Sequence, residues 1–177
     1  MKKLLSAAVI LFLMGLPAAA SDHESQVVTY KAEFIADLIN KVDFDQAGDR
    51  HDTGRVLIYV VGESQVGTKL QEFAAGESGE KKSIEVELVS INDDLGKADI
   101  LFLSSDDLGD LARVLKKVNG THTLTVSDAA DFARYGVMIN FVEEDGSSKV
   151  KLEVNRVVLD NVGAKLDSDL LKEAILI

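Results

Sequence analysis

Residues 62–69 have the sequence GESQVGTK, which contains the residue types that can cradle a phosphate: glycines, hydroxyl groups and a lysine. In a phosphate-binding loop the lysine follows the second glycine directly, so that its ammonium group reaches the outer phosphates. Here Thr68 intervenes, and one residue turns Lys69 by about 100° around a helix. The order argues against nucleotide binding, although the amides at a helix start would allow a weak anion site around Ser64 and Gln65.

Ser64 stands where a hydrolase would hold its nucleophile. The nucleophile elbow needs a glycine two residues later, at the position of Val66. A Ser-His-Asp triad would also need a histidine base, and all three histidines fall in segments that we expect to be terminal or loops: His23, His51 and His122. We therefore expect no catalytic residues and no enzyme.

The chain offers little to a metal ion. It has no cysteine, and its three histidines have no spacing that suits zinc. Acidic residues stand at 93–94, 106–107 and 143–145, where turns and helix starts are expected, and Gly146 follows the last group. The last of these groups lacks the alternating ligands of a calcium loop. We expect neither a metal nor another cofactor.

Alternating helices and strands must position these residues. The spacing of apolar residues predicts a first helix over 26–41, whose buried stripe comprises Val27, Tyr30, Phe34, Leu38 and Ile39. Runs and alternations of apolar residues predict strands at 56–61, 84–88, 98–103, 123–126, 137–142 and 149–154. Helices are predicted at 64–75, 107–118, 129–135, 156–162 and 167–174, and loops at 43–54 and 76–82.

The order of these elements predicts a single Rossmann-like α/β domain of three layers. Its sheet is mostly parallel and is closed at one edge by an antiparallel C-terminal hairpin, whose turn is Asp145-Gly146. In such sheets ligands bind at the carboxyl ends of the strands. The predicted ligand cleft therefore comprises Gly62, Ser64, Gln65, Ser104 and Ser105, next to Asp106.

The N-terminal residues predict export. Lys2 and Lys3 precede an apolar run over 4–16, and Pro17 and three alanines follow. The run of about 13 residues is shorter than the roughly 20 that a spanning helix needs. We expect a signal peptide over 1–20, cleavage after Ala20, and one domain over 21–177 in the periplasm.

Composition excludes several classes of function. Loss of Lys2 and Lys3 would take the formal net charge from −11 to −13, and so acidic a surface repels phosphate backbones and anionic bilayers. Nucleic-acid binding and membrane adsorption of the processed chain are therefore not expected. Without cysteine, the domain depends on its core alone, and thiol chemistry is ruled out.

Residues 123–155 have the sequence TLTVSDAADFARYGVMINFVEEDGSSKVKLEVN. The order of residues in this segment resembles the signature of the YfiR-like family of bacterial periplasmic proteins, and the resemblance extends from about residue 30 to the C-terminus. The positions that carry it are Ser127, Asp128, Phe132, Gly136, Met138, Ile139, Phe141 and Asn155. Taken singly, the apolar members are explained as core residues, Gly136 as a left-handed position and Asn155 as a helix cap.

The resemblance implies a homodimer that binds and restrains an inner-membrane diguanylate cyclase, and thereby controls cyclic di-GMP and biofilm formation. It also implies an outer-membrane lipoprotein that sequesters the regulator. Two features depart from the family: Val42-Asp43-Phe44-Asp45 replaces an aromatic-Trp-Pro group, and disulfide-forming cysteines are missing.

A second interpretation, a periplasmic small-ligand binding module, stays open beside the regulator. A regulator that binds another protein predicts a contiguous exposed apolar patch larger than a few hundred Å². A ligand-binding module predicts instead an enclosed pocket at the cleft and a ligand-dependent rise in melting temperature.

Overall fold

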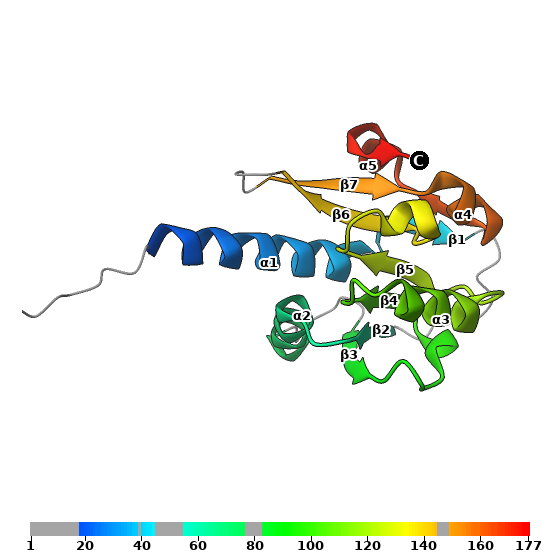
Figure 1. Ribbon diagram of the computed structural model, residues 1–177, viewed down its shortest axis with the longest axis horizontal. Helices are drawn as coiled ribbons and strands as arrows, with labels where there is room; N and C mark the ends of the chain where they lie inside the picture. The colour runs from blue at the N-terminus through cyan, green and yellow to red at the C-terminus, as the bar shows by residue number, and fades with distance from the viewer. Residues whose placement is uncertain (1–17, 39, 45–54, 77–82, 145–148) are drawn as a thin grey trace, which may run out of the picture.

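A seven-stranded sheet forms the centre of the protein in the computed structural model, which describes residues 18–38, 40–44, 55–76, 83–144 and 149–177 (Figure 1). Its strands follow the order β3-β2-β4-β5-β6-β7-β9. Their bounds are Arg55–Val61 for β2, Ser83–Val89 for β3, Ile100–Leu103 for β4, Leu124–Ser127 for β5, Ile139–Glu143 for β6, Val150–Val154 for β7 and Ile175–Leu176 for β9.

Neighbouring strands are parallel throughout, except that β6 and β7 are antiparallel. This confirms the predicted α/β class and its C-terminal antiparallel pair. The hairpin does not close the sheet, however, because β9 adds a further strand outside β7, with Leu176 beside Val154. The expected turn at 145–146 lies outside the described residues.

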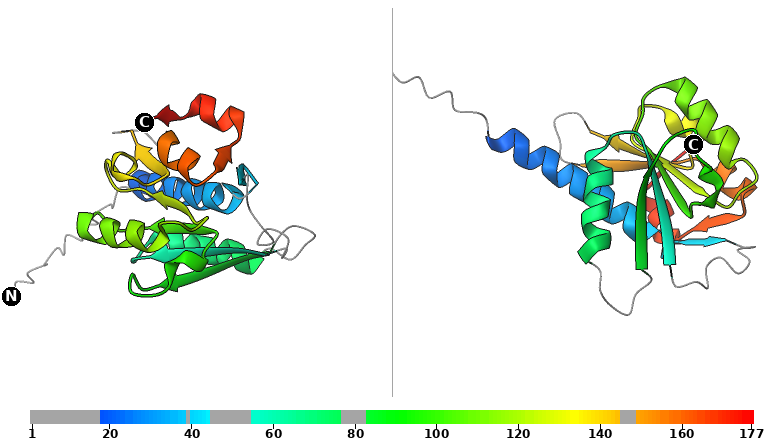
Figure 2. Two further views of the ribbon diagram at one scale, coloured as in Figure 1. Left: turned by 90° about the vertical axis from the view of Figure 1, so that its right-hand side faces the viewer. Right: turned by 90° about the horizontal axis from the view of Figure 1, so that it is seen from below.

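Helices cover both faces of the sheet (Figure 2). Alternate residues of the central strands enter different cores: Ile58 and Phe102 pack on one face, and Tyr59 and Leu101 on the other. This double burial is why β2 and β4 are continuous apolar runs. The helices are α1 Ala18–Leu38, α2 Gln65–Gly76, α3 Leu108–Val118, α4 Arg156–Asn161 and α5 Ser168–Glu173. Helix α3 covers the face of the sheet on which Tyr59 and Leu101 lie.

The first helix differs from its predicted stripe. Tyr30 is 42% exposed rather than buried, whereas Lys31, four residues after the buried Val27, is only 5% exposed. Ile35 and Leu38 continue this stripe. The helix begins at Ala18, so the expected cleavage site lies within its first turn, and Figure 1 shows its N-terminal end extending past the sheet.

A two-stranded antiparallel sheet was not predicted. Its strands are β1 Val42–Phe44 and β8 Ala164–Leu166. The expected loop over 43–54 is therefore wrong at its start, and residues 45–54 lie outside the described part of the chain. Strands of three residues are too short to show a period-two pattern. These two form because Ala164 and Leu166 are buried in the same core as Ile58 and Phe102.

The segment predicted as a helix over 129–135 is a short 3₁₀-helix, η3, over Phe132–Tyr135. Gly136 ends it at φ 113°, in the left-handed region that favours glycine. A second 3₁₀-helix, η2, spans Leu95–Lys97. Among the described helices, none combines the length and apolar character that a transmembrane span requires.

Candidate functional site

The sheet has a switch point between β2 and β4. After β2 the chain passes through α2 to β3 on one side, and it then continues on the other side of β2 with β4, β5 and β6. The loops that leave β2 and β4 therefore run in opposite directions from their carboxyl ends, which is where ligands bind in open α/β sheets. Gly62, Ser64 and Gln65 follow β2, and Ser104 and Ser105 follow β4.

The two loops touch at the switch point. Gly62 has φ 95°, and a Cβ atom there would stand 2.4 Å from the Ser104 carbonyl oxygen. The Ser104 hydroxyl donates a hydrogen bond of 3.1 Å to the Glu63 carbonyl, and the Ser104 amide donates one of 2.9 Å to the Val61 carbonyl. These contacts close the crevice at its centre and leave a hollow on each side.

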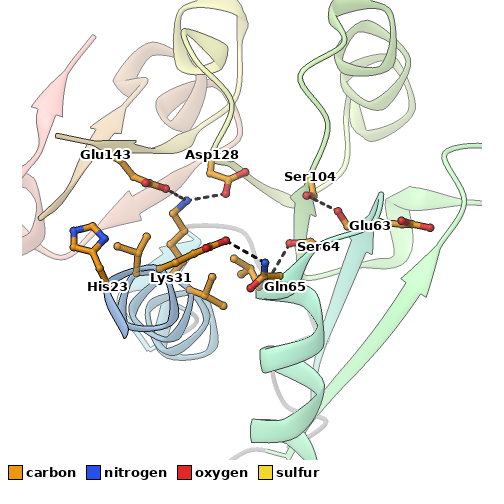
Figure 3. A pocket seen from close by; sticks show the side chains of 12 residues that line it. His23, Lys31, Glu63, Ser64, Gln65, Ser104, Asp128 and Glu143 are labelled. Atoms are coloured by element: carbon orange, nitrogen blue, oxygen red, sulfur yellow. Dashed lines mark hydrogen bonds and ion pairs between the residues drawn. The ribbon is translucent and has the colours of Figure 1, made fainter. Parts of the chain in front are cut away.

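The hollow beside α1, here called the α1 cleft, has a volume of about 420 Å³ (Figure 3). Valines of α1 and α2 form an apolar wall, and the polar lining residues are His23, Glu24, Lys31, Glu63, Ser64, Gln65, Ser104, Asp128 and Glu143. The rim residues Glu24, Glu63 and Gln65 are exposed. The cleft is thus open to solvent, not the enclosed pocket expected for a ligand-binding module.

Lys31 lies at the centre of the polar lining. Its ammonium donates hydrogen bonds of 2.8 Å to Asp128 Oδ2 and 2.7 Å to Glu143 Oε1. Burial by itself would lower the pKa of Lys31, but the bonds to Asp128 and then Glu143 outweigh burial, and the pKa is raised. Lys31 therefore carries its charge in the folded protein and links α1 to the ends of β5 and β6.

The start of α2 is already hydrogen-bonded. The Ser64 hydroxyl accepts bonds from the amides of Val66 at 3.1 Å and Gly67 at 3.4 Å, and the Ser64 carbonyl accepts from Thr68 at 3.1 Å. Ser64 is thus the cap of this helix. The amides of Val66 and Gly67 are thus occupied by the cap and are not free to bind an anion.

The lysine of the phosphate-loop-like segment lies away from this helix start. The Lys69 ammonium is 2.7 Å from the Glu72 carboxylate and 5.6 Å from the centre of the Phe73 ring. Both partners lie further along α2. The Lys69 ammonium is therefore held away from the start of α2.

Only part of the predicted cleft comes together. Ser64, Gln65 and Ser104 line the α1 cleft. Gly62 lies instead on the other side of the loop contact, in an open hollow of about 540 Å³ beside β3. The Ser105 hydroxyl donates to Asp110 and accepts from the Asp107 amide, so it belongs to the start of α3.

The signature residues occupy the opposite half of the sheet. Phe132, Met138, Ile139 and Phe141 are buried, and the Ser127 hydroxyl donates a 2.8 Å bond to the Leu103 carbonyl. Asp128 differs from these, because its carboxylate holds Lys31 and lines the α1 cleft.

Asn155 ties three segments together. Its Oδ1 accepts from the Val158 amide at 3.1 Å and so caps α4. Its Nδ2 donates to the Ala133 carbonyl at 2.8 Å, and its backbone amide donates to the Met138 carbonyl at 2.9 Å. The side chain thereby joins η3 to the start of α4, and the backbone amide adds a bond to the residue that precedes β6.

Sequence reasoning missed several residues of the α1 cleft: His23, Glu24, Lys31 and Glu143. A signal for Lys31 was present, since it stands four residues from both Val27 and Ile35 and therefore falls on the buried stripe of α1. A charged residue on an apolar stripe needs a partner of opposite charge. Glu143 gave no such signal, because its contact with Lys31 depends on the fold.

The two histidines within the described ranges lie in different parts of the fold. His23 was expected in a terminal segment but lies in α1, where it lines the α1 cleft. His122 precedes β5, and His51 lies outside the described residues. Across the described ranges, no three His, Asp or Glu side chains are grouped so that they could hold a metal ion.

Two solved structures share this fold. One is described as the ABC domain in complex with L-Trp from Streptococcus pneumonia, with 16% identity and a TM-score of 0.56. The other is a conserved domain protein from Vibrio cholerae, with 13% identity and a TM-score of 0.59. Each match covers 84% of this chain but only 59% of the solved chain. The protein is thus an α/β domain that spans about three fifths of these two structures.

Comparison of the sequence with protein-family models identifies the family. A family model described as YfiR/HmsC-like matches residues 29–174, and the protein belongs to this family. This confirms the resemblance seen in residues 123–155. Comparison with curated proteins gave no match. The matched range contains Lys31, Asp128 and Glu143, whereas His23 and Glu24 precede it.

Proposed function

We propose that the protein is an exported periplasmic regulator that binds an inner-membrane signalling protein, a diguanylate cyclase, and restrains its synthesis of cyclic di-GMP. Membership of the YfiR/HmsC-like family over residues 29–174 is the observation that carries this proposal. Restraint is a population shift, in which binding favours the inactive state of the cyclase. In this proposal the regulator is a homodimer without catalytic activity. An outer-membrane lipoprotein relieves the restraint on the cyclase by sequestering the regulator.

Export is part of the same proposal. Lys2, Lys3 and the apolar run over 4–16 form a signal peptide that ends at Ala20, which leaves residues 21–177 as the periplasmic domain. The cut falls within the first turn of α1 as the structure has it, three residues before the cleft residue Glu24.

Exposed apolar side chains at the β9 end of the sheet support a protein partner. The C-terminal apolar edge comprises Val157, Ile175, Leu176 and Ile177, whose exposed fractions are 66%, 44%, 49% and 36%. A hydrogen bond of 3.3 Å from the Arg156 amide to the Ile177 carbonyl holds the start of α4 against β9. Apolar groups gathered on a surface in this way are typical of interaction sites.

Binding to the periplasmic portion of a diguanylate cyclase from the same organism tests this function. We expect the natural chain to bind in titration calorimetry, and the double variant Val157→Asp, Leu176→Asp to bind at least about tenfold more weakly, because charges would be buried. Leu88→Asp is the matched control, since Leu88 is 59% exposed on β3 at the opposite edge. Absence of binding by the natural chain contradicts the proposal.

A small-ligand binding module is the second candidate function. The observation that favours it is the α1 cleft, which lies at the carboxyl ends of β2 and β4 beside the switch point. One structure with this fold is described in complex with L-Trp, which makes an amino acid a reasonable first ligand to test. Binding should raise the melting temperature, and a panel of small molecules that leaves it unchanged would count against this candidate.

A further inference from the structure

We infer that the outer edge of β3 binds an extended segment of another protein, in which apolar and basic side chains alternate. The inference goes beyond the proposed function, because this edge lies at the opposite end of the sheet from the C-terminal apolar edge (Figure 1). Four observations support it: the unpaired backbone of the strand, the apolar side chains on one face, the carboxylates on the other, and a hollow where the strand ends.

The backbone of β3 is paired on one side only. All seven residues of Ser83–Val89 pair with β2, and no described strand lies on the other side. The outward amides and carbonyls of residues 84–88 have no hydrogen-bond partner in the described part of the chain. The strand also contains no lysine or proline, the residues that commonly protect an edge from further pairing. The edge can therefore accept one more strand.

Apolar side chains are incompletely covered on the face toward α2. Ile84 and Val86 are half-buried at the border of the core that α2 covers. Leu88 is 59% exposed and lies over Gly67 of α2, where an added Cβ atom would stand 3.5 Å from the Leu88 Cδ2 atom. Alternate apolar residues of an added strand would extend this core and cover the three side chains.

Carboxylates lie on the opposite face of the strand. Glu85 accepts a bond of 2.6 Å from Arg55, whereas Glu87, beside Tyr59, is exposed and forms no ion pair among the described residues. A lysine or arginine opposite Glu87 on an added strand would form a cross-strand ion pair. The added strand is thus apolar toward α2 and basic toward Glu87.

The same carboxylates disfavour a second copy of this chain as the added strand. An antiparallel pairing that uses all of β3 is centred on Val86, so each Glu85 would face Glu87 of the copy. Like charges directly opposite each other destabilise a sheet. Charge complementarity therefore favours a basic segment of another protein.

An open hollow lies where β3 ends. Leu88, Val89 and Ile91 line the hollow of about 540 Å³ described above, together with Val61 and Thr68. In strand addition the backbone bonds give affinity, and pockets for side chains give specificity. The hollow can take one apolar side chain at the end of the added segment.

Three peptides with blocked ends and the length of β3, seven residues, test the inference. One alternates lysine and valine, one has the same residues with the lysines in a single block, and one alternates glutamate and valine. Each is added to the full chain as the cell processes it, and binding is measured by titration calorimetry at low ionic strength. We expect only the alternating lysine peptide to bind. Equal binding of either other peptide, or no binding of the alternating lysine peptide, would overturn the inference.

Hydrogen exchange locates the peptide. The outward amides of residues 84–88 should exchange at least about tenfold more slowly in the complex, because an added strand would protect them. Unchanged exchange there would overturn strand addition at this edge. Protection in the chain alone that is lost on dilution would show that a second copy occupies the edge, and would also overturn the inference.

Variants test the two faces of the strand. Glu87→Gln should bind the alternating lysine peptide about threefold more weakly, the loss of one exposed ion pair. Glu173→Gln removes the same charge from an exposed position on α5, which contacts β7 near the other end of the sheet, and should leave the affinity unchanged. Equal affinities of these two variants would overturn the role of Glu87.

Leu88→Asp separates this surface from the one that the proposed function uses. It places a charge beneath the apolar face of the added strand, and should abolish detectable binding of the peptide. The same variant is expected to keep the cyclase bound, so the two surfaces are tested independently. Peptide affinity that Leu88→Asp leaves unchanged would contradict an added strand over Leu88.

Discussion

The Lys31 ammonium lies 2.7 Å from a carboxylate oxygen of Glu143, although 112 positions separate the two residues in the chain. Lys31 belongs to α1 and Glu143 ends β6. Because Asp128 holds the same ammonium at 2.8 Å, one side chain fastens the first helix to the ends of two strands. The contact joins the family-signature half of the sheet to the α1 cleft.

Removal of this ammonium should destabilise the fold. Lys31→Met keeps a long apolar stem on the stripe of α1 but leaves Asp128 and Glu143 without their cation. We expect the free energy of unfolding in urea to fall by about 2 kcal/mol, since a half-removed buried ion pair costs more than a surface one. Lys69→Met removes an exposed pair with Glu72 and should cost about 0.5 kcal/mol or less. Equal losses for both variants would contradict the role of Lys31.

The close contact between the loops at the switch point predicts that replacement of Gly62 lowers the stability of the fold. Gly62→Ala places a methyl group 2.4 Å from the Ser104 carbonyl oxygen and forces alanine to φ 95°. We expect a loss of about 3 kcal/mol from backbone strain and overpacking together. Gly76→Ala is the control, because no atom stands within 4 Å of its added methyl group and the residue ends α2. Thermal unfolding that ranks the two variants equally would show that the contact is unimportant.

Asn155 allows its two side-chain bonds to be separated. Asn155→Ala loses both the cap of α4 and the bond to the Ala133 carbonyl, and should cost about 2 kcal/mol. Asn155→Asp keeps an oxygen for the Val158 amide but no longer donates to Ala133. A stability of the aspartate variant that equals that of the natural chain would mean that the Ala133 bond contributes nothing.

Stability should fall at alkaline pH. Burial, and then the charge of Glu87, raises the pKa of the Tyr59 phenol, and the pKa of Lys31 is also raised. Both groups keep their protons in the folded protein where the unfolded chain begins to lose them, above about pH 10. The unfolded chain then binds fewer protons, so the free energy of unfolding decreases as pH rises.

Tyr59→Phe tests the tyrosine part of this dependence. The variant should lose less stability between about pH 10 and 11 than the natural chain, by up to roughly 1.4 kcal/mol per pH unit. Tyr135→Phe removes a phenol that is 57% exposed and serves as the control. Urea unfolding at a series of pH values measures both, and a slope that Tyr59→Phe leaves unchanged would refute the prediction.

The sheet and the main helices were predictable because their patterns are long. β2 and β4 are runs that enter two cores, and α3 shows both its cap, Asp107, and the glycine that follows it, Gly120. The short strands β1 and β8 were not predictable. Each has only three residues, too few to show the alternation of a strand, and their pairing depends on burial against the core.

The candidate site was only half predictable for a similar reason. Ser64 and Ser104 follow strands, so the parallel sheet alone brings them to one edge. Lys31 and Glu143 meet through the packing of α1 across that edge, which no local pattern encodes. Tyr30 was assigned to the core because helical spacing fixes a face only to within a residue, and the buried stripe passes through Lys31 instead.

The central claim, restraint of a diguanylate cyclase, is tested most directly by cellular cyclic di-GMP. The gene is deleted, and the nucleotide is quantified by mass spectrometry in deleted, natural and complemented cells, under conditions where the protein is made. We predict that cyclic di-GMP rises on deletion, together with biofilm formation, and returns to its natural concentration on complementation. An unchanged concentration in the deleted cells would contradict the account.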